Sequence, residues 1–157
     1  MRKWAQAFIL VAAFCAQALI PTAAADDAQR IVGTWQRVSS KDPQGRALQP
    51  PAPASILIFT ADGHFAQIGF PEGRDSSDKP VNTFTREQLL ERFARVEASH
   101  GTYKVRRNVL ERENEGNINP AQEDQDINQV FRIEGDLLVL VMEPPAGRYE
   151  ARFKRVK

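Results

Sequence analysis

Apolar and polar residues alternate along much of the chain after residue 31, a period typical of strands that bury one face. The clearest case is 56–70, where two such runs flank a turn that contains Gly63 and form a hairpin. The predicted strands are 34–39, 56–59, 64–70, 101–113, 127–133, 137–143 and 148–156. No helix pattern separates the last of them, so they are expected to run antiparallel as a meander.

Seven or eight strands would leave two exposed edges in an open sheet, and closure into a barrel removes both. The pattern therefore predicts an all-β fold, an antiparallel up-and-down barrel of about eight strands. Polar segments rich in Pro, Gly and charge predict loops at 40–54, 71–82 and 113–124.

One segment, 85–98, has the pattern of a helix. Thr85 and Gln88 are spaced as a capping box, and Leu89 and Phe93 recur at helical spacing. Such a stripe is usually a packing face. The alternative is a lid over the mouth of the barrel.

Two predicted strands mix aromatic and basic residues on one face. The members are Tyr103, Val105, Arg107 and Val109 in one strand, and Tyr149, Ala151, Phe153 and Arg155 in the other. If these faces point inward, the barrel has an amphipathic interior that suits a ligand. A register shift of one residue would reverse the assignment.

The first 25 residues have the features of a signal peptide: a basic start, an apolar run and small residues that end in Ala23-Ala24-Ala25. A membrane anchor is the less favoured alternative, because the run is short and Gln6 and Gln17 interrupt it. Cleavage near Ala25 predicts a periplasmic or secreted protein with one domain at 31–157. It also removes Cys15, the only cysteine, so the mature chain would form no disulfide.

The net charge of the chain argues against a nucleic-acid partner. The chain has 21 basic and 20 acidic residues, and loss of Arg2 and Lys3 leaves 19 against 20, a net charge of −1. A nucleic-acid-binding protein would carry a basic excess. No further apolar segment approaches membrane length, so no membrane span is expected in the mature chain.

Motifs for a metal, a phosphate or a dinucleotide are missing from the sequence, which predicts neither a metal site nor a cofactor. His64 and His100 are the only histidines and occupy loop-like positions, where a solvated role is favoured. This leaves open an enzyme that needs no cofactor.

Arginine and tyrosine provide the candidate ligand contacts. Two or three arginines that converge could bind a carboxylate through paired hydrogen bonds, and a phenol could bind inside an apolar cavity. The candidates are Arg74, Arg107, Arg132, Tyr103 and Tyr149. Arg132 shares its strand face with Asn128 and Val130, the more polar face, which argues against an inward side chain.

Gly33-x-Trp35 at the start of the first strand resembles the lipocalin signature. The resemblance implies that Trp35 closes one end of a barrel and packs against an arginine of the last strand, here Arg155. A cation over an indole face is worth about 0.5–2 kcal/mol.

Residues 31–157 as a whole resemble the bacterial lipocalin-like domain family. The shared positions are Gly33, Thr34, Trp35, Leu57, Phe59, Asp62, Gly63, Arg74, Gly101, Thr102, Tyr103, Asn119, Pro120, Arg132, Gly135, Asp136 and Leu138. Phe153 stands where the family often has Trp. The resemblance implies a barrel with an internal cavity and no single function.

Three hypotheses follow. The first is a periplasmic or secreted protein that binds a small, partly apolar ligand, either neutral or anionic, in the barrel. The second is a lyase or isomerase in the same cavity, with Tyr103 and an interior arginine polarising a carbonyl. The third is an envelope protein with a filled barrel and no small ligand.

Overall fold

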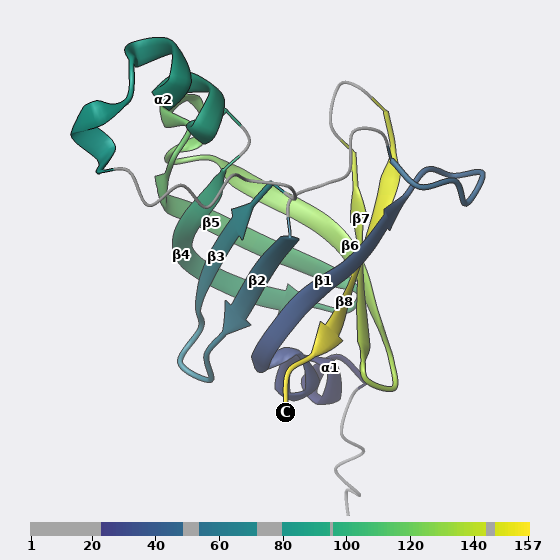
Figure 1. Ribbon diagram of the computed structural model, residues 1–157. Helices are drawn as coiled ribbons and strands as arrows, with labels where there is room; N and C mark the ends of the chain where they lie inside the picture. Colours follow the sequence, from purple (N-terminus) through teal and green to yellow (C-terminus); the bar gives the residue numbers. More distant parts are fainter. Residues whose placement is uncertain (1–22, 49–53, 72–79, 95, 144–146) are drawn as a thin grey trace, which may run out of the picture.

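Eight antiparallel strands form a closed barrel in the computed structural model, which describes residues 23–48, 54–71, 80–94, 96–143 and 147–157 (Figure 1). The strands are β1 (Gly33–Lys41), β2 (Ala54–Phe59), β3 (His64–Phe70), β4 (Glu97–Arg106), β5 (Val109–Asn117), β6 (Asp126–Glu134), β7 (Leu137–Met142) and β8 (Tyr149–Arg155). Each strand pairs with the next, and β8 pairs with β1 to close the sheet. The predicted all-β, up-and-down barrel is confirmed.

The single strand predicted at 101–113 is wrong, because the chain reverses at Arg107-Asn108 and forms β4 and β5. Arg107 has a φ of 56°, the left-handed conformation that tight hairpin turns require. Arg106 and Val109 are therefore opposite each other in neighbouring strands. Since β5 extends to Asn117, it also occupies the start of the loop predicted at 113–124.

Helix α2 (Arg86–Phe93) has the predicted capping box, with Thr85 and Gln88 bonded reciprocally. It ends at Phe93, five residues before the predicted end, because Glu97 begins β4 and pairs with β3. No residue of α2 is buried, and Leu90 and Phe93 are exposed. The expectation that its apolar stripe is a packing face is wrong for this structure.

Helix α1 (Ala23–Ile31) lies against one end of the barrel, and the sequence analysis predicted no helix there (Figure 1). The Trp35 side chain is fully buried there, and its Nε1 donates to the Ile31 carbonyl at 2.8 Å. The Arg155 guanidinium lies 4.1 Å from the Trp35 ring centroid and donates to the carbonyls of Val32 and Arg30. We call this end the α1 end, and the opposite end the α2 end (Figure 1).

The apolar core fills the half of the barrel nearest α1. It contains Ile31, Trp35, Leu57, Phe59, Phe65, Leu110, Phe131, Leu138, Leu140, Ala151 and Phe153. These residues alternate with outward side chains along each strand, as the period of a pleated strand requires. The half of the barrel nearest α1 is thus packed with apolar side chains.

Short 3₁₀ turns occur at 81–83 and 120–122. Among the described residues, no helix has both the length and the apolar character needed to cross a membrane.

Candidate functional site

Polar side chains replace the apolar core in the half of the barrel nearest α2. Their strand positions follow from the register, since residues opposite each other in neighbouring strands share a face. The buried or half-buried members are Arg37, Ser40, Ser55, Gln67, Glu97, Arg112, Asn114, Gln129 and Tyr149. These residues lie on β1 to β6 and on β8, so closure of the barrel is what brings their side chains together.

Glu97 links two strands across the interior. Arg37 Nη1 forms an ion pair with Glu97 Oε1 at 2.9 Å, and Gln67 Nε2 donates to Glu97 Oε2 at 2.7 Å. The Arg37 side chain is almost completely buried, whereas that of Glu97 is 30 % exposed. The network therefore reaches from the barrel interior to solvent at the α2 end.

Arg112 is the second interior cation. It is 5 % exposed; its Nη1 donates to Gln67 Oε1 at 3.3 Å, and its guanidinium lies 5.0 Å from the Phe65 ring centroid. Its Nε has no hydrogen-bond partner among the described residues. Burial lowers the pKa of Arg112 to about 10, and nearby Arg37 acts in the same direction against Glu97. Arg112 is still a cation at neutral pH.

The described interior near α2 holds two guanidinium groups, Arg37 and Arg112, against one carboxylate, Glu97. A buried charge without a counterion is costly, so this region is electrostatically incomplete. Further buried oxygens also have no partner among the described residues: Ser40 Oγ, Ser55 Oγ, Asn114 Oδ1 and Gln129 Oε1. An anion with hydrogen-bonding oxygens would complement this interior.

Tyr149 borders the same region. Burial raises the pKa of its phenol, and the charges of Arg37 and Glu97 both act on it. Its neighbour across the strands is Met142, which packs with Tyr149 against the apolar core. Tyr149 can therefore offer a protonated hydroxyl beside an apolar surface.

Tyr103 faces inward as predicted but lies nearer the α1 end. Its ring packs edge to face on Phe59, with centroids 4.9 Å apart, and its hydroxyl donates to the Thr60 carbonyl at 2.8 Å. The hydroxyl is thus committed to the β2–β3 turn rather than directed toward Arg37 or Arg112. The reaction hypothesis that relied on Tyr103 stays a prediction without geometric support.

The predicted arginines do not converge with the two tyrosines. Arg107 is exposed in the β4–β5 turn, and Arg132 is outside the barrel, bonded to Glu134 and Glu150. Arg74 lies outside the described residues. Of the four candidate ligand residues that the structure describes, Tyr149 is the one beside the buried arginines.

Sequence reasoning missed Arg37, Arg112 and Glu97. Arg37 follows Trp35 by two residues, so the period of a strand that buries Trp35 also buries Arg37. Recognition of Arg107-Asn108 as a turn would have placed Leu110, and hence Arg112, on the inner face. Glu97 was assigned to a helix, and nothing in its local sequence indicates a strand.

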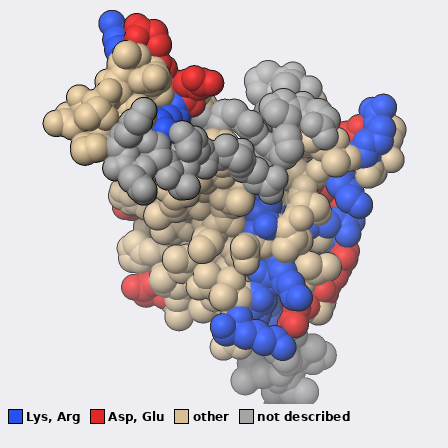
Figure 2. Space-filling view, viewed as in Figure 1, with Lys and Arg blue, Asp and Glu red and all other residues tan. Residues whose placement is uncertain are grey.

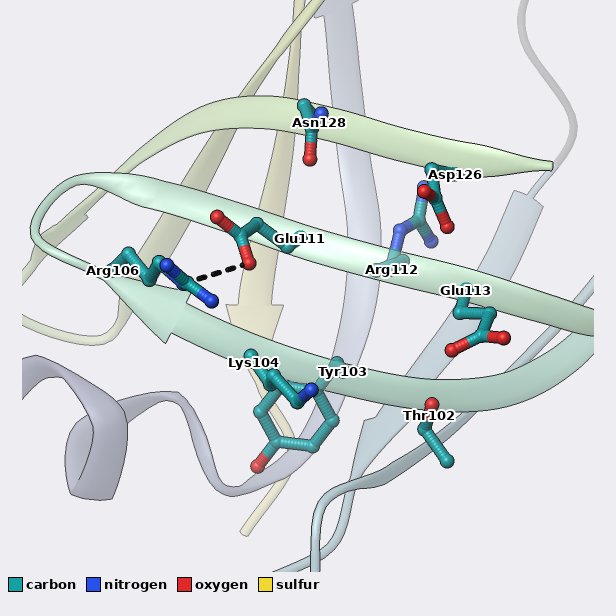
Figure 3. A pocket seen from close by; sticks show the side chains of 9 residues that line it. All are labelled: Thr102, Tyr103, Lys104, Arg106, Glu111, Arg112, Glu113, Asp126 and Asn128. Atoms are coloured by element: carbon teal, nitrogen blue, oxygen red, sulfur yellow. Dashed lines mark ion pairs between the residues drawn. The ribbon is translucent and has the colours of Figure 1, made fainter.

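A groove of about 380 Å³ lies on the outside of β4, β5 and β6 (Figure 3). Figure 3 shows Arg106 and Glu111 paired across two strands there, at 3.0 Å. Its exposed carboxylates include Glu113 and Asp126. No group of three or more metal-binding side chains occurs in the part of the chain that the structure describes. The groove is a solvated, charge-paired surface.

No protein-family model matches the chain, and no curated protein matches it. Among solved structures, the chain is similar to an uncharacterised protein from Bacteroides eggerthii, with 14 % identity and a TM-score of 0.47. That similarity covers 80 % of this chain and 99 % of the other.

Proposed function

We propose that the protein binds a small amphipathic anion, a carboxylate with an apolar body, inside the half of the barrel nearest α2. The observation that supports this is Arg112, a buried cation with a free Nε–H and no carboxylate bonded to it among the described residues. A carboxylate accepts two parallel hydrogen bonds from a guanidinium, and the strength of this contact increases away from water.

The orientation of the ligand follows from the packing. Core residues fill the half of the barrel nearest α1. The ligand carboxylate would therefore lie at Arg112, and the apolar body would lie between Arg112 and the α2 end. Met142, Tyr149 and Ile127 are half-buried side chains that could contact this body. A ligand in this position would bind both the polar and the apolar surface of the site.

The proposal includes membership of the lipocalin-like family and export of the chain. Its support is the order of motifs along 31–157 and the closed eight-stranded barrel. Cleavage near Ala25 would remove the first turn of α1 but keep Arg30 and Ile31, whose carbonyls bond to Arg155 and Trp35. N-terminal sequencing of protein from the periplasm and the medium tests this part, because an intact Met1 in all fractions would exclude it.

The binding experiment compares saturated monocarboxylates with alcohols of the same chain length. Thermal unfolding is followed with each compound, because a ligand at 100 times its Kd stabilises the folded state by about 2.7 kcal/mol. Acids are expected to raise the melting temperature, and alcohols are expected to have little effect. Equal shifts would contradict carboxylate recognition, and no shift with straight-chain, branched and aromatic acids would contradict the function.

Native mass spectrometry of protein from its own cells then identifies the natural ligand. A bound acid that is released unchanged on denaturation supports a binding protein. Conversion of that acid during incubation would instead favour an enzyme.

A further inference from the structure

The outside of β2 and β3 differs in composition from the rest of the barrel. Neither strand contains Asp, Glu, Lys or Arg, and their outward side chains are mainly aliphatic or aromatic. The most exposed are Ile56, Ile58, Ile68 and Phe70, joined by Val38 of β1. We call these five residues the uncharged face. Figure 2 shows a continuous surface without charged atoms over β2 and β3, with Lys and Arg gathered to its right.

Two outward apolar residues of β7 are covered by charged side chains. Val139 and Val141 face outward on β7, yet they are almost fully buried. Arg132 and Arg152 lie on either side of Val139 in the strand register, and both form ion pairs with Glu150. Long charged side chains cover apolar surface in this way while their charged groups stay in water.

Among the described residues, no long charged side chain covers Ile56 or Ile68 of the uncharged face in this way. Ile56 and Ile68 lie opposite each other on β2 and β3, and they are 45 % and 55 % exposed. Their immediate neighbours in the same row are Gln36 on β1 and Ala98 on β4, which carry no charge. A contiguous exposed apolar patch on a folded domain usually marks an interaction site.

The face is also hollowed. A groove of about 370 Å³ runs along it, lined by Gln36, Ile56, Ile58, Ala66, Ile68 and Phe70. Ile58 and Ile68 in its lining are exposed side chains that could enter an equivalent groove. The same surface therefore provides both a recess and residues of a size to fill one.

We propose that the uncharged face is the interface of a homodimer with two-fold symmetry. A two-fold axis places a surface against itself, so every charged residue near the axis would meet a charge of its own sign. A face without charges avoids that repulsion. An anionic lipid surface or a charged peptide would instead need countercharges, which β2 and β3 lack. Because the barrel is closed, the two copies would pack sheet against sheet rather than add strands.

The test measures the mass of the full-length chain in solution by sedimentation equilibrium over a wide concentration range. Ile56→Glu and Ile68→Glu each place a carboxylate in the interface, where like charges would meet across the axis. Each is expected to weaken association by more than about a hundredfold. Val130→Glu is the matched control, since Val130 is outward and 47 % exposed on β6, away from the face.

Circular dichroism and thermal unfolding establish that each variant is folded. Ile68→Gln, which adds polarity without charge, replaces Ile68→Glu if that variant fails to fold. A wild-type dimer that both face variants dissociate and Val130→Glu leaves intact supports the proposal. A wild-type monomer at every concentration would overturn it. If that monomer bound to vesicles of neutral lipid, the face would be a lipid-binding surface instead. Association insensitive to all three variants would overturn it too, and would point to another segment such as residues 1–22.

Discussion

Arg37 and Glu97 are 60 residues apart in sequence, and an ion pair of 2.9 Å joins them inside the barrel. The pair leaves Arg112 as the cation without a carboxylate, at a distance where Glu97 and Arg37 both influence its pKa. In the proposed site, Glu97 would compete with the ligand carboxylate for the two arginines.

Glu97→Gln removes this competitor. The affinity for a monocarboxylate is expected to increase by about tenfold, because one negative charge near the two guanidinium groups is lost. The free energy of unfolding is expected to fall by about 1.5–3 kcal/mol, the usual contribution of hydrogen bonds to charged groups. Calorimetric titration and urea unfolding measure the two effects. Equal affinity in the variant and the wild type would show that Glu97 does not compete.

Arg112→Met exchanges the buried cation for an apolar side chain of similar length. Replacement of a buried charge by a well-packed apolar residue is often neutral or stabilising by about 1–4 kcal/mol, so stability should not fall. Carboxylate affinity is expected to fall by about tenfold to a hundredfold, because hydrogen bonds to a charged group are lost.

Lys104→Met is the control for Arg112→Met, since Lys104 is exposed on the neighbouring strand. It removes one positive charge from the protein without changing the interior, so binding should be retained. If both variants lose affinity equally, long-range charge rather than direct contact explains the loss.

The residues of this interior differ in how far the sequence alone predicts their positions. Trp35 and the strand period place Arg37 inside from local information alone. The position of Glu97 depends on pairing between β3 and β4, which lie on either side of the α2 segment. Val96 falls at helical spacing after Leu89 and Phe93, so the local pattern favoured a helix, and long-range sheet pairing overrode it.

The barrel itself was predictable because its signals repeat along the chain: apolar and polar residues alternate, and turn residues separate the runs. Two irregularities were not predictable. The register shifts between Arg37 and Ser39 in β1 and between His100 and Gly101 in β4. A bulge re-aims the side chains that follow it and leaves little local sequence signal. The interior near α2 therefore required the structure, and so did helix α1 at the other end, whereas the structural role of Trp35 was expected.

Arg155→Lys tests the closure at the α1 end. Lysine keeps the charge but cannot stack as a plane on Trp35 and donate to the carbonyls of Val32 and Arg30 at once. The variant is expected to lose about 1–2 kcal/mol in the free energy of unfolding, within the range for a cation on an indole. Arg106→Lys at the exposed end of β4 is the control, and it should cost less than about 0.5 kcal/mol. Equal losses would show that Arg155 contributes only its charge.

Gly33→Ala tests the α1 end of the barrel through a change at the backbone rather than at Arg155. Gly33 has a φ of 138°, and an added Cβ would collide with Arg155 Nη1. We expect a loss of about 1–3 kcal/mol from strain, together with disturbance of the Arg155 contact. Gly135→Ala is the control, because Gly135 has a φ of 61° with open space around it. Urea unfolding should show a greater loss for Gly33→Ala; the reverse order would mean that Arg155 moves aside without cost.

The two tyrosines of the chain, Tyr103 and Tyr149, provide a test by pH. Burial raises the pKa of both phenols above 10.0, with Asp62 adding to the shift at Tyr103. Each folded pKa lies above the unfolded value, so the stabilisation is complete below pH 10 and is lost as the pH rises through the folded pKa. Phenolate absorbance should therefore appear above pH 10 in the folded protein and shift to lower pH in urea.

Tyr149→Phe assigns the titration and connects it to the ligand. The variant should retain the Tyr103 transition alone. In the wild type, a bound carboxylate should raise the pKa of Tyr149 further, because a second negative charge opposes phenolate formation. Tyr103→Phe is the matched control, since its hydroxyl bonds to Thr60 near the α1 end. A ligand-induced shift that persists in Tyr149→Phe and disappears in Tyr103→Phe would place the carboxylate at the wrong end of the barrel and contradict the proposed site.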